Sequence, residues 1–483
     1  MNYLELLQLA APEAIVVVTA LLVLTIGLAR AGADAISSLV ARLGLIAAGG
    51  AVLMLPRDAN LLGGMLVVSP LTSLFKIICL VLALFTIALT RRNSLPRHHS
   101  EYLALLLLAT VGLMLLVGSE ELLMIFIGLE LTGLALYLMT AFDKSDRYSA
   151  EAGLKYFLFG STASAFTLFG LSFVYGSTGT TALAAIGEKV TAGPLEPLLA
   201  AGIVMTLVGL AFKVAAAPFH LWAPDTYEAA PISSAAFIAS ASKVAAFVVL
   251  GKVLLIGFAP AQGSAEWYAL TPGWSPILAA LAALSIVVGN LVALAQTNVR
   301  RLLAYSAVAH AGYTLLGIIA GPAGFAATLF YTTIYALTLL GAFGVVAWVR
   351  DATGGDDLSH FVGLRTRSPM LAGCMAIFML SLAGLPPLAG FFGKFYLFSV
   401  ALSAGEKHGL LWLVVLALLG SLVSLYYYLA VLKAIFVEDA AHDAPTIIPE
   451  SAHRITLTVL AAAVVIVGIL PTNLVARIVA SLQ

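Results

Sequence analysis

A few ionisable residues lie inside long apolar stretches of the chain, and their types and spacing could do chemistry. They are Glu130, Lys155, Lys213, Lys243 and Lys394. A lysine at the centre of a bilayer costs about 2.5–3.5 kcal/mol, so it is expected to be paired, hydrated or functional. Desolvation lowers the pKa of a lysine, whereas a nearby carboxylate raises it. A lysine whose distance to a carboxylate can vary is therefore a candidate proton carrier.

Other residues in these stretches have a functional and a structural reading. His220 and His310 add imidazoles that titrate near physiological pH, although each alone is more often a packed, hydrogen-bonded residue. Lys155 follows Glu151 by four residues, so an exposed helical ion pair is an equal alternative to a functional role. Glu130 could form a static buried pair with one lysine that only fixes helix packing.

Two of the buried lysines lie next to a proline that must interrupt a helix. Pro218 follows Lys213 by five residues, and Lys394 ends the segment LAGLPPLAGFFGK. Proline removes a backbone hydrogen bond, and in lipid the freed carbonyl needs a partner from protein or water. We therefore expect a hydrated, protein-lined niche beside each of these lysines. The alternative is that proline and glycine merely kink the membrane helices.

Charged residues nearer the predicted outer ends of helices need no special role. We expect the Lys76 and Lys252 side chains to extend to the interface. We expect Glu13, Glu120 and Glu121 to be solvated there.

The composition sets the class of protein. The 483 residues are 61% hydrophobic and 10% charged, and their mean hydropathy is +1.06. No soluble domain could bury so many apolar side chains. Twenty-four basic and 24 acidic residues balance, so nucleic acid is not an expected partner. Cys79 and Cys374 are isolated, which excludes a disulfide framework and Cys-based zinc or iron–sulfur sites. Because GxGxxG and Walker motifs are absent, nucleotide binding by this chain is not expected.

The sequence predicts an all-α polytopic membrane protein with about fourteen spans of about 20 apolar residues. The expected spans are 9–29, 38–55, 72–90, 103–118, 121–141, 151–176, 198–222, 233–256, 276–295, 302–319, 323–349, 369–402, 410–436 and 454–480. The turn at Ser119–Glu120 is the narrowest division. The apolar run from Ala14 to Ala29 is interpreted as the first span and not as a cleaved signal.

Basic residues predict the orientation, because they accumulate in cytoplasmic loops. One side receives Arg30, Arg42, Arg91, Arg92, Arg97, Lys144, Arg147, Arg300, Arg301, Arg350, Arg365, Arg367, Lys433 and Arg454. The other receives Arg57, Lys76, Lys189, Lys252, Lys407 and Arg477. Both termini are therefore expected on the outer side.

The two broken spans suggest an internal repeat. Spans four to eight and nine to thirteen would form two inverted five-helix halves, each with a lysine beside a break in its fourth helix. The predicted segments are 1–100 (three helices), 101–257 (first repeat), 258–437 (second repeat) and 438–483 (C-terminal helix).

Several motifs resemble a known family. FKVAAAPFHLWAPDTYEAAP, ASKVAAF, RRLLAYSAVAHAGY and LSLAGLPPLAGFFGKFYLF are similar to the antiporter-like membrane subunits of respiratory complex I. EAGLKYFLFGSTASAFTLFG, and a lysine where subunit M has a glutamate in GFFGKF, are closest to the subunit N family of bacterial NADH-quinone oxidoreductase. The resemblance implies fourteen helices with two inverted repeats and two discontinuous helices. It also implies a place in the bacterial inner membrane among sister membrane subunits.

The resemblance also implies roles. It places proton translocation on Glu130, Lys213, Lys243 and Lys394, with Lys155 matching a further family lysine. Quinone reduction elsewhere in the complex would drive it, so the chain would be a non-redox subunit without a cofactor or metal of its own. NAD, FMN, iron–sulfur clusters and quinone would belong to other subunits or their interfaces. A cation/proton antiporter subunit of an Mrp-type complex and a structural scaffold remain the alternatives.

Overall fold

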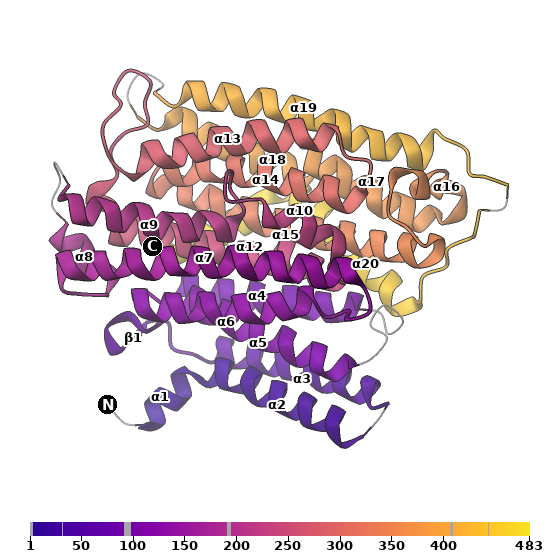
Figure 1. The fold of residues 1–483 in the computed structure, drawn as a ribbon, viewed down its shortest axis with the longest axis horizontal. Coiled ribbons are helices and arrows are strands. Elements are labelled where there is room, and N and C mark those ends of the chain that lie inside the picture. Colours follow the sequence, from indigo (N-terminus) through magenta and orange to yellow (C-terminus); the bar gives the residue numbers. More distant parts are fainter. Residues whose placement is uncertain (1–2, 31, 91–97, 191–194, 406–408, 443) are drawn as a thin grey trace.

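The computed structural model describes residues 3–30, 32–90, 98–190, 195–405, 409–442 and 444–483 (Figure 1). Its helices are α1 (Tyr3–Leu9), α2 (Ala11–Ala29), α3 (Asp34–Leu53), α4 (Pro70–Leu89), α5 (His99–Gly118), α6 (Leu122–Thr140), α7 (Arg147–Thr178), α8 (Leu183–Lys189), α9 (Pro197–Val214), α10 (Trp222–Ala229), α11 (Ile232–Phe237), α12 (Lys243–Lys252), α13 (Trp274–Leu294), α14 (Val299–Ile319), α15 (Pro322–Thr353), α16 (Leu364–Arg367), α17 (Pro369–Ala383), α18 (Ala389–Ser403), α19 (Leu411–Phe436), α20 (Ser451–Ile469) and α21 (Pro471–Ser481). Short π or 3-10 turns are η1 (Leu62–Gly64), η3 (Ile238–Ser242), η4 (Val253–Gly257), η5 (Ala259–Ala261) and η6 (Leu358–Phe361). Strands β1 (Ala59–Leu61) and β2 (Leu66–Val68) form a small antiparallel hairpin.

The predicted all-α membrane architecture is confirmed. Thirteen helices of the described chain are long and apolar enough to cross a bilayer, one of them running through α11, η3, α12 and η4. The shorter apolar helices α17 and α18 together form the remaining predicted span. The turn at Ser119–Glu120 does separate two helices, because α5 ends at Gly118 and α6 begins at Leu122.

Two predicted spans are corrected. The seventh, expected over 198–222, ends at Val214, and a separate helix, α10, begins at Trp222. The fourteenth, expected over 454–480, ends at Ile469, and Pro471 starts α21. Proline has no backbone N–H and cannot continue a helix, but it is favourable at a first turn, so the chain restarts there.

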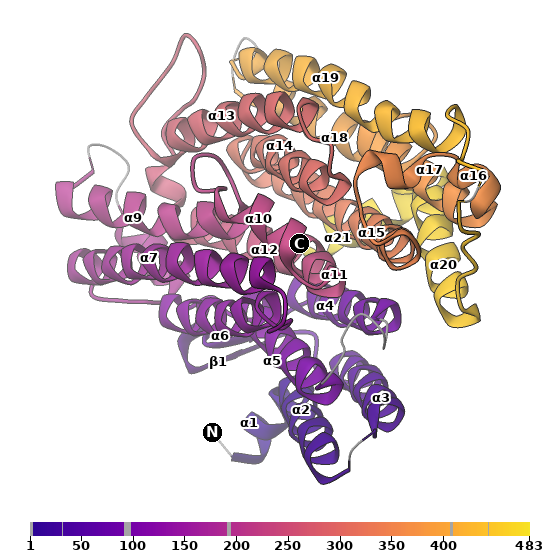
Figure 2. The same ribbon diagram turned by 45° about the vertical axis from the view of Figure 1, so that its right-hand side comes forward.

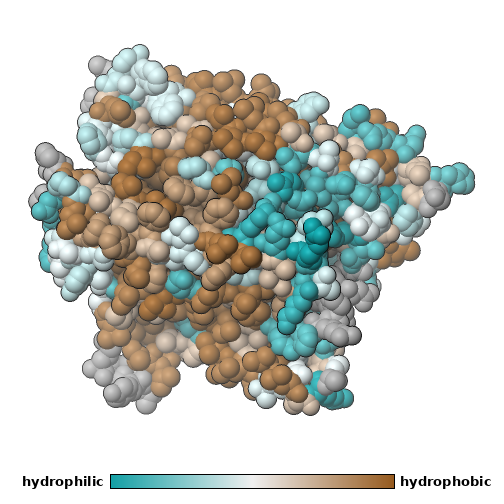
Figure 3. Space-filling model, viewed as in Figure 1, coloured by the Kyte–Doolittle hydropathy of each residue, from teal (hydrophilic) through white to brown (hydrophobic). Residues whose placement is uncertain are grey.

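The helices run side by side, and their burial separates a core from a lipid-facing shell. α14, α15 and the α11–η4 segment are almost entirely buried in the middle of the molecule. Helices such as α2 and α3 instead expose apolar side chains, including Leu21 and Leu22. Apolar residues cover the middle of the face in Figure 3, and hydrophilic ones gather toward its two ends and in a patch right of centre. This pattern fits a bilayer around the waist of the molecule.

The two predicted repeats share their irregularities. The third helix of each, α7 and α15, has 32 residues and ends at a left-handed glycine, Gly179 or Gly354. Glycine accepts this backbone conformation without steric cost. The fourth helix of each is broken, after α9 and after α17. Figure 2 shows α13 and α14 lying together on the opposite side of the molecule from α2 and α3. The predicted domain boundaries remain a proposal.

Candidate functional site

The first helix break surrounds Lys213. This buried lysine lies in the last turn of α9, where the negative end of the helix dipole favours a cation. Within the described residues it makes no hydrogen bond and no ion pair. The backbone freed by the break is satisfied from within the protein, because Trp222 Nε1 donates to the Phe212 carbonyl over 3.1 Å and the Ala217 amide donates to Ser285 Oγ over 2.8 Å.

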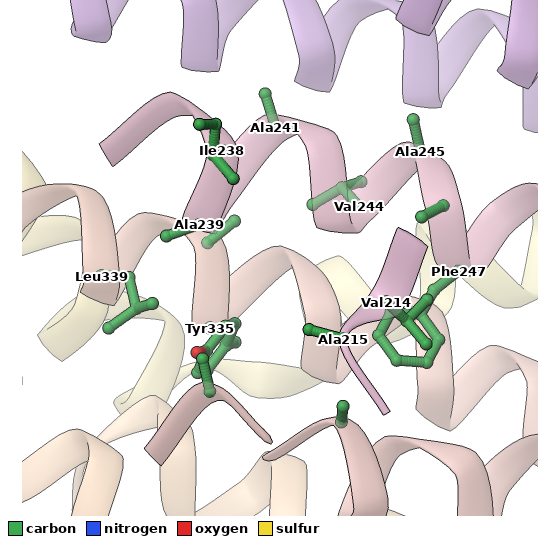
Figure 4. Close-up of a cluster of buried hydrophobic side chains, with 14 of the residues drawn as sticks. Val214, Ala215, Ile238, Ala239, Ala241, Val244, Ala245, Phe247, Tyr335 and Leu339 are labelled. Carbon is green, nitrogen blue, oxygen red and sulfur yellow. The ribbon is translucent and has the colours of Figure 1, made fainter. Parts of the chain in front are cut away.

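Apolar side chains enclose this end of α9. Figure 4 shows Val214 and Ala215 among buried residues of the neighbouring helices, including Val244 and Phe247 of α12 and Tyr335 of α15. Lys213 therefore lies in an apolar setting beside the predicted helix break, and the hydrated niche expected there remains a prediction.

Glu130 lies on α6 next to a small cavity. Ser164 Oγ of α7 donates a hydrogen bond to Glu130 Oε1. Both residues border a cavity of about 20 Å³, also lined by Gly209 and Phe212 of α9. That volume has room for a single water molecule. Glu130 and Lys213 form no direct ion pair in the described structure, so the static pair considered above is absent.

Lys243 lies at the centre of the molecule. It is the first residue of α12, directly after the π-helical turn η3, a type of irregularity frequent at functional sites. Its ammonium donates to the Ala307 carbonyl of α14 over 2.8 Å. It also lies 5.7 Å from the centre of the Tyr335 ring, within cation–π range.

His310 of α14 is buried between two tyrosine hydroxyls. Its Nε2 is 3.0 Å from Tyr428 Oη, and its Nδ1 is 2.5 Å from Tyr331 Oη. Tyr428 Oη also shares a hydrogen bond with Ser306 Oγ. The His310 ring lies 4.9 Å from the ring of Tyr335, which in turn faces Lys243. A neutral imidazole donates at one nitrogen and accepts at the other, so the two tyrosines fit its two roles.

Lys394 lies on α18, just after the second break. Its ammonium donates to the Ala383 carbonyl over 3.1 Å and to Ser421 Oγ over 2.9 Å. Ala383 is the last residue of α17, where the break leaves carbonyls without an intrahelical partner. The ammonium also lies 5.4 Å from the centre of the Tyr313 ring. Tyr313 Oη accepts from Asn290 Nδ2 over 2.8 Å.

Polar and aromatic groups thus continue from Lys243 to Lys394. We call Tyr313, Tyr331, Tyr335, Tyr427 and Tyr428 the tyrosine cluster. Tyr427 packs on Tyr428 with ring centres 4.6 Å apart, and its hydroxyl donates to Asn290 Oδ1 over 3.1 Å. His310 sits among these rings. The arrangement can exchange protons between oxygen and nitrogen atoms.

A polar cavity opens on the side of the protein to which the sequence analysis assigned the larger number of basic residues. This cavity of about 460 Å³ is lined by Lys155, Asp225, Glu228, Arg301, Arg350 and Asp356, among others; we call it the vestibule. Lys155 is 2.8 Å from both Glu151 and Asp225, so the predicted helical ion pair exists but the ammonium is shared. The Lys155 side chain is 43% exposed, and it is therefore not a deeply buried lysine.

Two vestibule carboxylates, Asp225 and Asp356, have pKa values lowered by neighbouring cations. Partial burial alone would raise the pKa of Asp225, but the bound Lys155 and Arg301 keep it below its ordinary value. Burial likewise opposes the charge of Asp356, and the guanidinium groups of Arg300 and Arg350 keep its pKa below the ordinary value.

His220 lies within the first break, in the turn that joins α9 to α10. It is buried, and its ring is 6.3 Å from that of Tyr305, over which Arg301 lies at 5.9 Å. Its Nδ1 is buried and makes no hydrogen bond of regular geometry to the described residues, and the backbone of Pro218 is a further polar neighbour of the ring. A buried ring nitrogen of this kind is available to a water molecule or a proton.

Comparisons with known proteins agree across the chain. Residues 119–423 match the family described as "NADH:quinone oxidoreductase/Mrp antiporter, TM". NADH-quinone oxidoreductase subunit N 2 of Acidobacterium capsulatum is 48% identical over 98% of both chains. Subunit N of Desulfovibrio desulfuricans is 41% identical over 86% of this chain and 84% of its own.

The chain belongs to the NADH-quinone oxidoreductase subunit N family. A chain in the structure of respiratory complex I from Thermus thermophilus with bound aureothin has a TM-score of 0.81 and 34% identity, covering 96% of this chain and 98% of that chain. A chain of the Mrp complex from Dietzia sp. has the same TM-score at 20% identity, covering 98% and 97%, which shows a shared fold only.

The expectation is wrong for four of the five outer charges. Lys76 and Lys252 are buried, with side chains 1% exposed, and do not extend to the interface. Lys76 lies 2.7 Å from the buried Glu13, and Lys252 lies 3.1 Å from Glu120, whose side chain is 27% exposed and so keeps contact with solvent as expected. Glu121 is buried, and its carboxylate caps the first turn of α6. Pairing and capping compensate the buried charges.

Sequence reasoning also missed the tyrosine cluster of this subunit N chain. The available signals were two tyrosines four residues apart in α15 and three in succession in α19, all in apolar surroundings. Tyrosine rings in apolar helices are interpreted as packing residues until the hydrogen-bond partners of their hydroxyl groups are known.

No cluster of metal-binding side chains is present in the described part of the chain. Four residues of the charge count, Arg91, Arg92, Arg97 and Lys407, lie outside the described residues.

Proposed function

We propose that the chain is the proton-translocating, non-redox membrane subunit of an NADH:quinone oxidoreductase. The 48% identity to a subunit N over 98% of the chain supports the assignment to that complex. The contact of both Lys243 and Lys394 with one buried cluster of tyrosine side chains around His310 carries the proposal. NAD, FMN, iron–sulfur clusters and quinone would be bound by other subunits or at their interfaces. Sister membrane subunits and the bilayer of the bacterial inner membrane would surround the chain, with both termini on the outer side.

Proton uptake would begin in the vestibule. From there the buried Nδ1 of His220 offers the next site on the way to Lys213. The cavity beside Glu130 has room for one water between α6, α7 and α9. Movement of the Glu130 carboxylate relative to Lys213 would change how strongly that lysine holds its proton. Glu130 therefore acts as a modulator, and Lys213 and Lys243 act as carriers.

Lateral transfer would follow through His310. When His310 gains a proton at one ring nitrogen and loses one at the other, the proton moves between Tyr331 and Tyr428 without a net change on the ring. Lys394, held by the Ala383 carbonyl and Ser421, would accept the proton before its release outward. The order of these steps is part of the proposal.

Replacement of Lys243 by alanine tests this function. Proton pumping and NADH:quinone reductase activity would be measured in the same inverted membrane vesicles. We expect pumping per NADH oxidised to fall steeply, because the first buried carrier of the lateral path is removed. Lys144→Ala is the matched control, since Lys144 is an exposed lysine in the α6–α7 connection. Undiminished pumping by Lys243→Ala with full reductase activity would contradict the proposal.

The antiporter alternative is tested by a different transport assay. The matched family includes Mrp antiporters, and an Mrp complex shares the fold. Sodium–proton exchange in vesicles that lack NADH dehydrogenase activity would favour this alternative. Copurification of the chain with flavin- and cluster-bearing subunits would favour the oxidoreductase.

A further inference from the structure

Two consecutive arginines, Arg300 and Arg301, begin α14 and contact α10, the short helix that follows the first break. Arg301 binds α10 through side chains. Its Nη1 donates to Asp225 Oδ1 over 2.9 Å and to Glu228 Oε2 over 2.7 Å. These partners lie almost one helical turn apart on α10, so a single nitrogen holds one face of that helix.

Arg300 binds the end of the same helix through its backbone. Its Nη1 donates to the carbonyl of Ala230, the residue directly after α10, over 3.0 Å. Its Nε donates to Asp356, which also accepts from Arg350 over 2.8 Å and from Asn298 over 2.6 Å. The Arg300 side chain is 3% exposed. It is thus a buried cation with two partners in different elements.

These contacts matter because α10 lies between His220 and Lys243 in the chain. The helix begins two residues after His220 and leads through α11 and η3 to Lys243. α14 carries His310 and the Ala307 carbonyl that binds Lys243. The arginines therefore attach the segment between two candidate carriers to the helix that carries the next one. They also attach the first repeat to the second.

We propose that Arg300 and Arg301 are positioning residues that clamp α10 onto α14 and so keep Lys243 and His220 in register with His310. The inference rests on the proposed function. The two ring nitrogens of His310 lie 2.5 and 3.0 Å from the hydroxyl oxygens of Tyr331 and Tyr428. A displacement of about 1 Å can reduce the rate of such a reaction about 100-fold. A shift of α10 would therefore lower proton transfer without touching any carrier.

A lysine can make the contacts of Arg301 but cannot make both contacts of Arg300. Arg301 uses one nitrogen for both carboxylates, and an ammonium with three donors can do the same. Arg300 uses two separate nitrogens for Asp356 and for the Ala230 carbonyl, and a single ammonium cannot reach both. If the two arginines contributed only positive charge on this side of the membrane, both lysine variants would pump protons equally well.

The test compares Arg301→Gln, Arg301→Lys and Arg300→Lys in the intact complex in inverted vesicles. Assembly is measured by copurification, and the readout is protons pumped per NADH oxidised. We expect Arg301→Gln and Arg300→Lys to lower this ratio at least about threefold, and Arg301→Lys to keep more than about half of it. Arg365→Gln is the control, because Arg365 pairs with Asp439 in an exposed contact.

The outcomes separate the clamp from the underlying function. Normal pumping by Arg301→Gln, whose parent side chain is 31% exposed, would overturn the clamp even if Arg300→Lys fails to assemble. Equal pumping by the two lysine variants would also overturn it. Lys243→Ala is included in the same set. If that variant pumps normally, the proposed function fails; if it alone loses pumping, only the clamp is wrong.

Discussion

The buried ion pair between Glu13 and Lys76 allows a quantitative prediction. The two groups are 2.7 Å apart, with side chains 8% and 1% exposed, and join α2 to α4. Neither makes a hydrogen bond of regular geometry within the described residues. Breaking a buried pair by removing one partner costs about 3–5 kcal/mol, whereas replacing both by neutral groups of similar volume is often nearly neutral. Lys76→Met and Glu13→Gln should therefore each destabilise more than the double variant.

The measurement is denaturant unfolding of the purified protein in mixed micelles at pH 7, followed by tryptophan fluorescence. The double variant should lie within about 1 kcal/mol of the parent. The exposed pair Arg365–Asp439 supplies the control cycle, in which no measurable coupling is expected. The reasoning would be refuted if both single variants were as stable as the double variant.

Three further predictions concern the candidate site. Tyr428→Phe removes the hydroxyl that meets His310 Nε2, and pumping per NADH should fall several-fold while the assembled complex is retained; unchanged pumping would remove this tyrosine from the path. Asp225→Asn should lower thermal stability at pH 7. Because the pKa of Asp225 is held below its ordinary value, the stabilisation is complete above about pH 4 and lost below it, so melting of parent and variant should converge in acid. Gly209→Ala places a methyl group against Thr167 at the small cavity beside α6, so slower pumping is expected in the same vesicle assay.

Much of the fold was predictable because it follows from hydrophobic length. Each span needs about 20 apolar residues, and that requirement is visible in the sequence. The breaks beside Lys213 and Lys394 were also predictable, since proline has a local steric effect. The end of the last span at Ile469 was missed because the apolar pattern continues past Pro471.

Pairing was less predictable than burial. The depth of Lys213, Lys243 and Lys394 follows from their place in a span. The partners of Lys76 and Lys252 come from helices distant in sequence, so their burial could not be separated from an interfacial position. The tyrosine cluster was missed for the same reason. A tyrosine in an apolar helix is ordinary until tertiary structure brings its hydroxyl to a histidine.

The two longest helices affect how the protein fits its bilayer. At 1.5 Å per residue, the 32 residues of α7 and of α15 extend about 48 Å, against about 30 Å of hydrocarbon. Tilting or protrusion into the headgroup layers must absorb the excess of about 18 Å in each. Lipids with longer acyl chains would cover more of this surplus without stretching either helix. The shorter helices around them would then experience the mismatch first, and dependence of activity on acyl-chain length would originate in those helices.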